Sequence, residues 1–328
     1  MNRRTFDSTA PLQFVVNGKS GNSDSDATCA EIEAVLRDAG RACHVHFAAP
    51  GELAAVAKAA ARTATETDSA VVAVGGDGTI STVAQAAYDA GCVMGVIPEG
   101  TFNYFAREHG VPTTSVSDAL QWLLRALPEP VQISAVNEQV FLVNASLGLY
   151  PDLLQDRESW KARFGRSQLV AFSAGISTLL RAQRRLRLSI EWEQQRRELV
   201  TLTLFVGNNR LQLEQLGLNA GDIPSEGASS DGHITAVILR PLGTLAMLNL
   251  MLRGAMGQLG EAASVDHFVC RSLHVKSSSL WGEKRVKVAC DGEVTWMDAP
   301  LTLRVLPEPL WLLKAVPLTE SPEPATAA

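Results

Sequence analysis

The chain has 328 residues, of which 46% are hydrophobic and 20% charged. This is a globular composition, and the length suggests two domains of about 150 residues each. The 29 basic and 35 acidic residues give a net charge of −6, which argues against non-specific nucleic-acid binding, because that requires a basic excess. No apolar run approaches the roughly 20 residues of a membrane span, and no apolar core follows Arg3 and Arg4, so we expect neither a transmembrane helix nor a signal peptide.

The cysteines and histidines do not suggest a metal site. The five cysteines are odd in number and none forms a C-x-x-C pair, so reduced thiols in a cytoplasmic protein are expected. His44 and His46 would share one face of a strand. Half-exposed strand side chains explain this pair more simply than metal ligation does.

The first 130 residues alternate between strand-like and helix-like patterns. Strands are predicted at 14–17, 42–47, 69–74 and 93–97. Helices are predicted at 27–39, at 52–64, at 79–90, from about 102, and from a capping Ser115 through 126. This alternation predicts a mostly parallel sheet covered by helices.

The pattern changes near Pro128 and Pro130, after which strands dominate. Strands are predicted at 140–144, 186–192, 199–206, 233–239, 273–276, 285–289 and 301–305, and helices at 168–182 and 242–256. The second half is therefore predicted to be a mainly antiparallel β domain. The tail after Leu318 is rich in proline, alanine and serine and is expected to be disordered.

The most informative stretch is Gly75–Thr79, which reads Gly-Gly-Asp-Gly-Thr between an apolar strand and a helix. Glycines let the backbone approach a phosphate closely, and a helix N-terminus offers free N–H groups. Asp77 beside a phosphate suggests a bridging Mg²⁺ or a hydroxyl partner, and Thr79 could cap the helix or touch phosphate. A capped tight turn is the structural alternative, but three glycines exceed what such a turn needs. The stretch matches neither a P-loop nor G-x-G-x-x-G.

A second strand-to-helix turn contains Gly100 and Thr101. Alone, it is as compatible with a capped helix start as with a binding site. The carboxyl ends of parallel strands share one edge of a sheet, so this turn, Gly75–Thr79 and Asn17–Gly21 can converge on one ligand.

Three segments, taken together, resemble the catalytic domain of diacylglycerol kinases, a family that includes bacterial lipid kinases, sphingosine kinases and ceramide kinases. They are Asn17–Gly21, Gly75–Thr79 and Gly100–Arg107. The Gly-Gly-Asp-Gly-Thr motif is shared with NAD kinases, whereas Gly-Thr-x-Asn followed by Phe-Ala-Arg is more specific to the lipid kinases. The resemblance runs from about Pro11 to Pro317.

The resemblance implies an N-terminal three-layer α/β nucleotide-binding domain and a C-terminal β-sandwich domain, with the active site in the cleft between them. The ATP-binding kinase domain would comprise residues 11–130 and a returning strand at about 300–317. The substrate domain would comprise residues 131–299, and residues 319–328 would form the disordered tail.

The resemblance also implies roles for single residues. Asp77 would organise Mg²⁺ or orient the acceptor hydroxyl, Glu293 would be the general base, and Asp231 would bind a structural Mg²⁺. By spacing alone, the Asp-Gly pairs at 231–232 and 291–292 are hairpin turns. The segment Val206–Asn209 resembles a Gly-Asn segment near the site. The implied nucleotide-binding residues are Asn17, Gly18, Lys19, Gly75, Gly76, Asp77, Gly78, Thr79, Thr101 and Asn103.

Several residues depart from the pattern common in the family. Ser81 and Thr82 stand where asparagine and glutamate are common, and Tyr104 stands where aspartate is common. Phe47 lies near a position that is often threonine, and Glu99 adds negative charge beside the expected polyphosphate site. These departures leave open a nucleotide-binding regulatory protein that has lost catalysis. A soluble-substrate kinase of the NAD-kinase type is the other alternative.

The activity that the resemblance implies is transfer of the γ-phosphoryl group of Mg-ATP to a hydroxyl of a diacylglycerol-like or related lipid. Such a kinase is expected in the cytoplasm, in transient peripheral contact with the inner membrane surface, with a homodimer as one expected assembly. The apolar stretches 169–180 and 245–252 and an arginine cluster at 181–187 could rest on an anionic bilayer. A packed core helix with a solvated basic end is the favoured explanation of that cluster.

Overall fold

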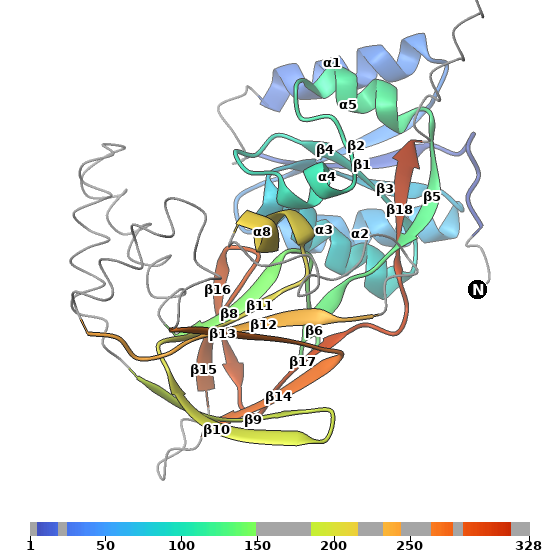
Figure 1. The fold of residues 1–328 in the computed structure, drawn as a ribbon. Coiled ribbons are helices and arrows are strands. Elements are labelled where there is room, and N and C mark those ends of the chain that lie inside the picture. Colours follow the sequence, from blue (N-terminus) through green and yellow to red (C-terminus); the bar gives the residue numbers. More distant parts are fainter. Residues whose placement is uncertain are drawn as a thin grey trace, which may run out of the picture.

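The computed structural model describes residues 5–18, 25–148, 185–215, 232–243, 264–277 and 285–315. These residues form three six-stranded sheets. Figure 1 shows the first sheet between two layers of helices, with the other two sheets gathered on one side of this α/β unit. The predicted fold class, an N-terminal α/β unit followed by an all-β unit, is confirmed. Among the described residues, no helix combines the length and the apolarity needed to cross a membrane.

The first sheet is built mainly from the N-terminal strands. Its order is β2-β1-β3-β4-β18-β5, and only β5 runs antiparallel to its neighbour. The central strands β3 and β4 are buried along their whole length, which explains their continuous apolar sequences. The strands are β1 (Leu12–Asn17), β2 (Cys43–Ala48), β3 (Ala70–Gly75), β4 (Val93–Pro98), β5 (Ala126–Val131) and β18 (Leu310–Ala315).

Helices cover both faces of this sheet. Helices α1 (Ser25–Asp38) and α5 (Val116–Leu123) lie over one face, and α2 (Leu53–Glu66) and α3 (Asp77–Ala90) lie over the other (Figure 1). The short helix α4 (Tyr104–Glu108) follows the turn after β4. Helix α2 buries four alanines, which lets it lie close to α3 and to the sheet.

The C-terminal unit consists of two antiparallel sheets, ordered β10-β9-β14-β17-β6-β7 and β13-β12-β11-β8-β15-β16. Apolar side chains from both sheets form one shared core, so the two sheets pack face to face as a β-sandwich. The helix α8 (Arg210–Gln215) follows β11. The strands are β6 (Ser134–Val136), β7 (Gln139–Phe141), β8 (Asn144–Gly148), β9 (Leu186–Trp192), β10 (Gln195–Thr201), β11 (Thr203–Gly207), β12 (Ile234–Leu239), β13 (Val265–Cys270), β14 (Ser272–Ser277), β15 (Arg285–Cys290), β16 (Glu293–Asp298) and β17 (Leu301–Val305).

The end of the α/β unit differs from the prediction. The helix that Ser115 caps ends at Leu123 rather than at Ala126, and β5 carries the first sheet on through Val131. Pro128 and Pro130 are therefore strand residues. They are tolerated because β5 is an edge strand, where one side needs no ladder hydrogen bonds.

Two of the predicted strands are each split between different sheets. The stretch 140–144 divides into β7 and β8, because the amides of Leu142 and Val143 donate to the Asp291 carboxylate instead of to a neighbouring strand. The stretch 199–206 divides into β10 and β11. Here the Thr201 hydroxyl accepts a hydrogen bond from the Thr203 amide and closes the turn between the strands.

The prediction missed β13 and β16, which are the two edge strands of one sheet and mix apolar residues with polar and charged ones. The returning strand, predicted at about 300–317, is present within that range but begins later than its start. Strand β17 pairs with β14 and β6 in the β-sandwich, and only β18, beyond Pro307 and Pro309, joins the first sheet. The predicted helix 168–182, nearly all of the helix 242–256, and the tail 319–328 lie outside the described residues.

Candidate functional site

The ends of β1, β3 and β4 meet at one edge of the first sheet. The side-chain amide of Asn17 donates a hydrogen bond of 3.0 Å to the Thr79 hydroxyl. Gly76 and Gly100 touch backbone to backbone: a Cβ added to Gly100 would lie 2.7 Å from the Gly76 Cα. This close approach favours residues without a side chain, which explains the glycines at positions 76 and 100.

Helix α3 begins at Asp77, two residues earlier than predicted, with Gly76 as its N-cap residue. The Asp77 carboxylate does not cap its own helix. Its Oδ2 accepts a hydrogen bond of 3.0 Å from the amide of Asn103, the N-cap residue of α4. Asp77 therefore fastens the second glycine-containing turn to the first.

The other oxygen of Asp77, Oδ1, is buried and has no hydrogen-bond partner among the described residues. Burial raises the pKa of the Asp77 carboxyl, while the backbone N–H groups of Asn103, Tyr104 and Phe105 lower it; the net direction is upward. A buried carboxylate oxygen without a donor is costly, and such an atom is suited to an incoming cation or donor.

Thr79 and Asn103 use their polar groups to hold the turns together. Thr79 lies inside α3 rather than at its cap and is 4% exposed. Asn103 adopts a left-handed conformation with φ of 50°, and its side-chain amide binds both the N–H and the C=O of Gly100, each over 2.9 Å. Thr101, by contrast, is exposed at this edge. Side chains shape the two turns, which leaves backbone N–H groups as the natural phosphate ligands.

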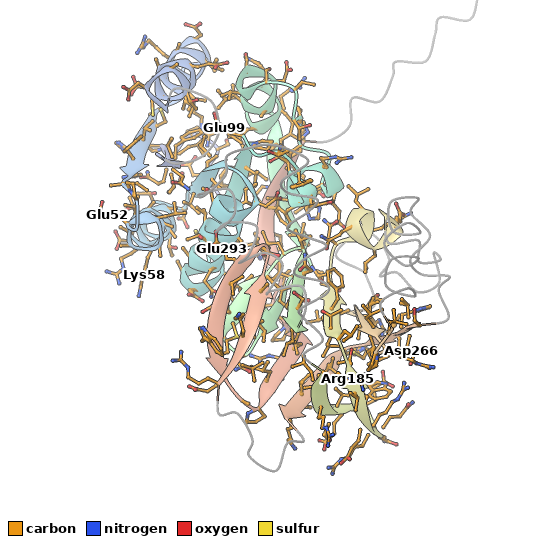
Figure 2. All side chains as sticks on the ribbon, turned by 90° about the vertical axis from the view of Figure 1, so that its left-hand side faces the viewer. Glu52, Lys58, Glu99, Arg185, Asp266 and Glu293 are labelled. Carbon is orange, nitrogen blue, oxygen red and sulfur yellow. The ribbon has the colours of Figure 1, made fainter. Side chains whose placement is uncertain are left out.

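Glu293 reaches the same region from the C-terminal unit. Asp291 and Gly292 form the two-residue turn between β15 and β16, with φ of 47° and 88°, so the hairpin expected from this Asp-Gly pair is present. The Glu293 carboxylate lies beside the first turn of α3: its Oε1 is 3.2 Å from where a Cβ on Gly78 would sit. Figure 2 shows Glu293 where the two units meet, with Arg185 and Asp266 at the opposite end of the β-sandwich.

Asp291, just before Gly292, is buried and fully hydrogen-bonded. Its carboxylate accepts hydrogen bonds from the amides of Leu142 and Val143, each over 2.8 Å, and from that of Asn144 over 3.1 Å. The Ser81 hydroxyl of α3 donates a fourth, over 2.7 Å. Burial raises the pKa of the Asp291 carboxyl and these four hydrogen bonds lower it; burial is the larger effect, so the net direction is upward.

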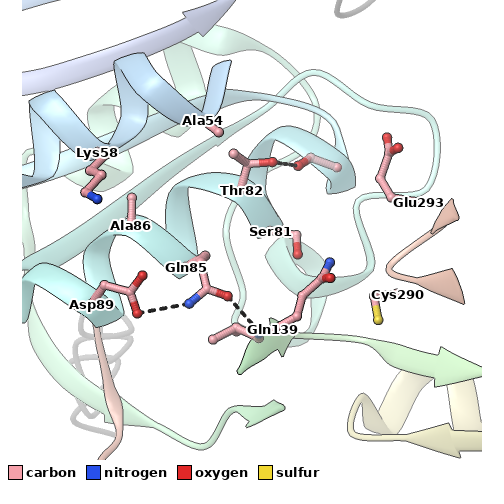
Figure 3. A pocket seen from close by; sticks show the side chains of 12 residues that line it. Ala54, Lys58, Ser81, Thr82, Gln85, Ala86, Asp89, Gln139, Cys290 and Glu293 are labelled. Atoms are coloured by element: carbon pink, nitrogen blue, oxygen red, sulfur yellow. Dashed lines mark hydrogen bonds between the residues drawn. The ribbon is translucent and has the colours of Figure 1, made fainter. Parts of the chain in front are cut away.

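A pocket of about 320 Å³ runs along α3 between the two units (Figure 3). One end is bounded by Gly78 and Glu293 and the other by Lys58 and Asp89. Cys290 also lines it, but burial raises the pKa of this thiol far above its ordinary value, which disfavours the reactive thiolate. The pocket brings a basic and an acidic side chain to a space that borders the glycine-rich turn.

Residues after β11 connect the C-terminal unit to α4 of the α/β unit. Asn209 is completely buried; its side chain donates to the Tyr104 carbonyl over 3.2 Å and also to the Glu108 carboxylate. Glu108 accepts a further hydrogen bond of 2.8 Å from the Arg210 amide at the start of α8. Sequence reasoning missed Glu108, because its partner is about a hundred residues away and no local pattern marks it.

Two predicted site residues, Lys19 and Asp231, lie outside the described residues. Within the described ranges, no group of three or more acidic, histidine or cysteine side chains could hold a metal ion. The buried Asp77 Oδ1 still fits Mg²⁺, because this ion is commonly held by one or two carboxylates together with phosphate oxygens of the substrate.

Comparison with known proteins places this geometry in context. Residues 11–136 match the diacylglycerol kinase catalytic domain. The chain is 29% identical over 228 residues to a diacylglycerol kinase of Bacillus subtilis, a match that covers 68% of this chain and 70% of that protein. It is 33% identical over 140 residues to a protein from Enterobacter sp. (strain 638) named "probable lipid kinase YegS-like", covering 41% of this chain and 44% of that one.

A third relative, an uncharacterized protein of Synechocystis, is 26% identical over 247 residues, which is 75% of this chain and 54% of that protein. The chain thus matches only about half the length of some of these relatives. In three dimensions it is similar to the crystal structure of a diacylglycerol kinase from Bacillus anthracis, with a TM-score of 0.65 and 18% identity over 93% of this chain and 97% of that one. This likeness supports the fold of both units.

Proposed function

We propose that the chain is an ATP-dependent lipid kinase, because residues 11–136 match the diacylglycerol kinase catalytic domain. It transfers the γ-phosphoryl group of Mg-ATP to a hydroxyl of a diacylglycerol-like lipid. The observation that carries the proposal is the contact between Glu293 and Gly78, because it brings a carboxylate of the β-sandwich to the glycine-rich turn of the α/β unit. A phosphate on that turn would therefore lie near a candidate base.

The nucleotide would bind at the carboxyl edge of the first sheet. The backbone N–H groups of Gly75–Thr79, at the start of α3, would hold its phosphates. Asn17, Gly18, Lys19, Thr101 and Asn103 are the further proposed nucleotide-binding residues. Phosphoryl transfer depends on positioning and on stabilising charge more than on covalent chemistry, which suits a site made of backbone donors.

Mg²⁺ would be held by Asp77 through its buried Oδ1, with phosphate oxygens completing the coordination. When bound, the ion would offset the negative charge of the phosphates. Asp231 is the proposed ligand of a second, structural cation.

In the reaction, Glu293 accepts the proton of the lipid hydroxyl. The hydroxyl oxygen then forms a bond to the γ-phosphorus, and the bond from that phosphorus to the β–γ bridging oxygen breaks, which releases ADP. Asp77 orients the acceptor hydroxyl or would organise Mg²⁺ at the turn. A lipid acceptor implies transient contact with a membrane surface, and we propose that this contact takes place on the cytoplasmic side.

The decisive test is phosphoryl transfer from γ-labelled Mg-ATP to a panel of acceptors. Mixed micelles would present diacylglycerol, monoacylglycerol, phosphatidylglycerol, sphingosine and ceramide, with NAD as the soluble acceptor. Glu293→Gln serves as the catalytic blank, and equal ATP binding by the blank shows that it is folded.

Label in an organic-extractable product, absent from the blank, is the expected result and identifies the acceptor class. Label in NADP would move the chain to the soluble-substrate branch. ATP binding with no transfer to any acceptor would favour the regulatory alternative.

A further inference from the structure

The hairpin that carries Glu293 is attached to α3 at two points on one helix face. Ser81 donates its hydroxyl to Asp291, and Gly78, three residues earlier, makes room for the Glu293 carboxylate. Residues i and i+3 of a helix are neighbours on its surface, so the two contacts lie side by side. One helical turn therefore meets both ends of the Asp291-Gly292-Glu293 segment.

Asp291 extends this attachment to a third segment. Besides Ser81, its carboxylate binds the amides of Leu142, Val143 and Asn144, which lead into β8. We call these five residues the Asp291 brace. They join α3, the start of β8 and the β15–β16 turn through one buried carboxylate, and Ser81 is the member that belongs to the α/β unit.

We propose that Ser81 is a positioning residue for Glu293: its bond to Asp291 fixes the β15–β16 hairpin so that the Glu293 carboxylate stays against the glycine-rich turn. This inference rests on the proposed lipid kinase function. The Ser81 hydroxyl is the donor that this role requires, because a hydroxyl can donate one hydrogen bond to a carboxylate.

Gln85 offers a matched control. It lies one turn beyond Ser81 on α3 and also bonds across the two units, because its Oε1 accepts a hydrogen bond of 2.7 Å from the Val140 amide in β7. This bond does not involve the β15–β16 hairpin. A general loosening of the two units would thus follow from either substitution, whereas loss of Glu293 positioning would follow only from a change at Ser81.

The experiment compares Ser81→Ala, Ser81→Thr and Gln85→Ala with the unmodified chain, using the lipid that the acceptor panel identifies. Ser81→Ala is expected to lower kcat about 10- to 100-fold, the range for misplacing a catalytic group by about 1 Å, with the KM for ATP within about twofold. Ser81→Thr keeps the hydroxyl and should restore most of kcat. Gln85→Ala should leave kcat within about twofold.

Amide hydrogen exchange supplies a readout that needs no activity. In Ser81→Ala, the amides of Leu142, Val143 and Asn144 and those of the β15–β16 hairpin should exchange about 10-fold faster than in the unmodified chain. In Gln85→Ala they should keep their protection. Asp291 itself is a poor test position, because its replacement would leave four hydrogen-bond donors without an acceptor and could prevent folding.

Each outcome decides something. An active chain whose kcat is the same with serine or alanine at position 81 overturns the inference and leaves the proposed function standing. Equal losses in Ser81→Ala and Gln85→Ala, or unchanged exchange at the hairpin, also overturn it. Absence of transfer by the unmodified chain rejects the proposed function and, with it, the catalytic part of the inference; faster exchange in Ser81→Ala alone would then still establish the brace.

Discussion

Asp77 is half-buried and Asp291 is buried, and both precede a glycine, yet their carboxylates are used differently. The Asp77 Oδ2 accepts a hydrogen bond of 3.0 Å from the Asn103 amide at the start of α4, whereas its Oδ1 has no partner among the described residues. Asp291 accepts four hydrogen bonds, two on each oxygen. In the same Asp-Gly dipeptide, the carboxylate is therefore incompletely hydrogen-bonded in the α/β unit and completely hydrogen-bonded in the β-sandwich.

This difference indicates a ligand-binding role for Asp77 and a structural role for Asp291. A buried polar atom without a partner costs free energy, and such atoms persist at functional sites where a ligand completes them. A carboxylate with four donors has no need of one. Asp77 is thus expected to matter mainly for activity and Asp291 mainly for stability, and the substitutions below test that division.

The largest expected effect is on activity at Asp77. Asp77→Asn should lower phosphoryl transfer roughly 1,000-fold, because it removes the charge that would meet Mg²⁺ and the phosphates. The asparagine oxygen can still accept the hydrogen bond from the Asn103 amide, so the two turns should stay joined. The measurement is initial rate with the best acceptor of the panel, alongside urea unfolding of the same samples.

A matched comparison is Asp118→Asn, at an exposed helix cap far from the turns, which should keep its rate. If Asp77→Asn transfers phosphate within about tenfold of the unmodified rate, Asp77 serves only to link the two turns. That result would contradict the assignment of Asp77 to activity and of Asp291 to stability.

The next effect is on stability at Asp291. Asp291→Asn should lower the free energy of unfolding by about 3 kcal/mol, because the amide NH₂ would face N–H groups that now donate to a carboxylate oxygen. Urea unfolding, with the midpoint and slope both fitted, measures this loss. A loss below about 1 kcal/mol would show that the four hydrogen bonds barely exceed the cost of burying the charge.

The contrast between these two aspartates could be only half predicted from the sequence. The apolar strand before Gly75–Thr79 and the helix after it were enough to predict the phosphate-binding turn, because local period and glycine content specify it. The Asp291-Gly292 hairpin was equally visible as a turn. The partners of Asp291 were not, because Ser81 and the Leu142–Asn144 amides are 147 to 210 residues away in the chain.

The same limit explains the errors in the fold. The parallel strands β1, β3 and β4 are buried and apolar, so their sequences predict them well. The edge strands β13 and β16 are held by one neighbour each and carry little apolar signal. Their place is decided by pairing with distant strands, which no local pattern records.

A smaller effect on phosphoryl transfer is expected at the contact between Gly78 of the α/β unit and Glu293 of the β-sandwich. Gly78→Ala would put a Cβ 3.2 Å from the Glu293 Oε1, so the carboxylate must move by a few tenths of an ångström. We expect transfer to fall about 10-fold, while helix α3 keeps or gains stability, because alanine favours a helix more than glycine does. Initial rates and thermal unfolding of the variant measure the two effects separately.

The control for this substitution is Gly243→Ala, where an added Cβ meets no described atom within 4 Å. It should leave the rate within about twofold. An unchanged rate in Gly78→Ala would mean that the observed place of the Glu293 carboxylate is not the one used in catalysis.

The smallest effect concerns the pH dependence of stability. Burial raises the pKa of Asp77 above its ordinary value of 3.8, so the unfolded chain releases this proton at lower pH than the folded one does. As pH rises from about 3.8 through the higher native pKa, ionisation favours the unfolded state, and above that range the penalty stays constant. Relative to Asp77→Asn, the unmodified chain should therefore lose stability across this window.

Urea unfolding of both chains at a series of pH values measures the difference directly, because other titrating groups cancel between them. A difference that instead moves in favour of the unmodified chain as pH rises would mean that the amides at the start of α4 stabilise the ion more than burial destabilises it. Repeating the series with Mg-ATP should shrink the penalty if the ligand completes the Oδ1 environment, and this addition ties the stability of the turn to its proposed use.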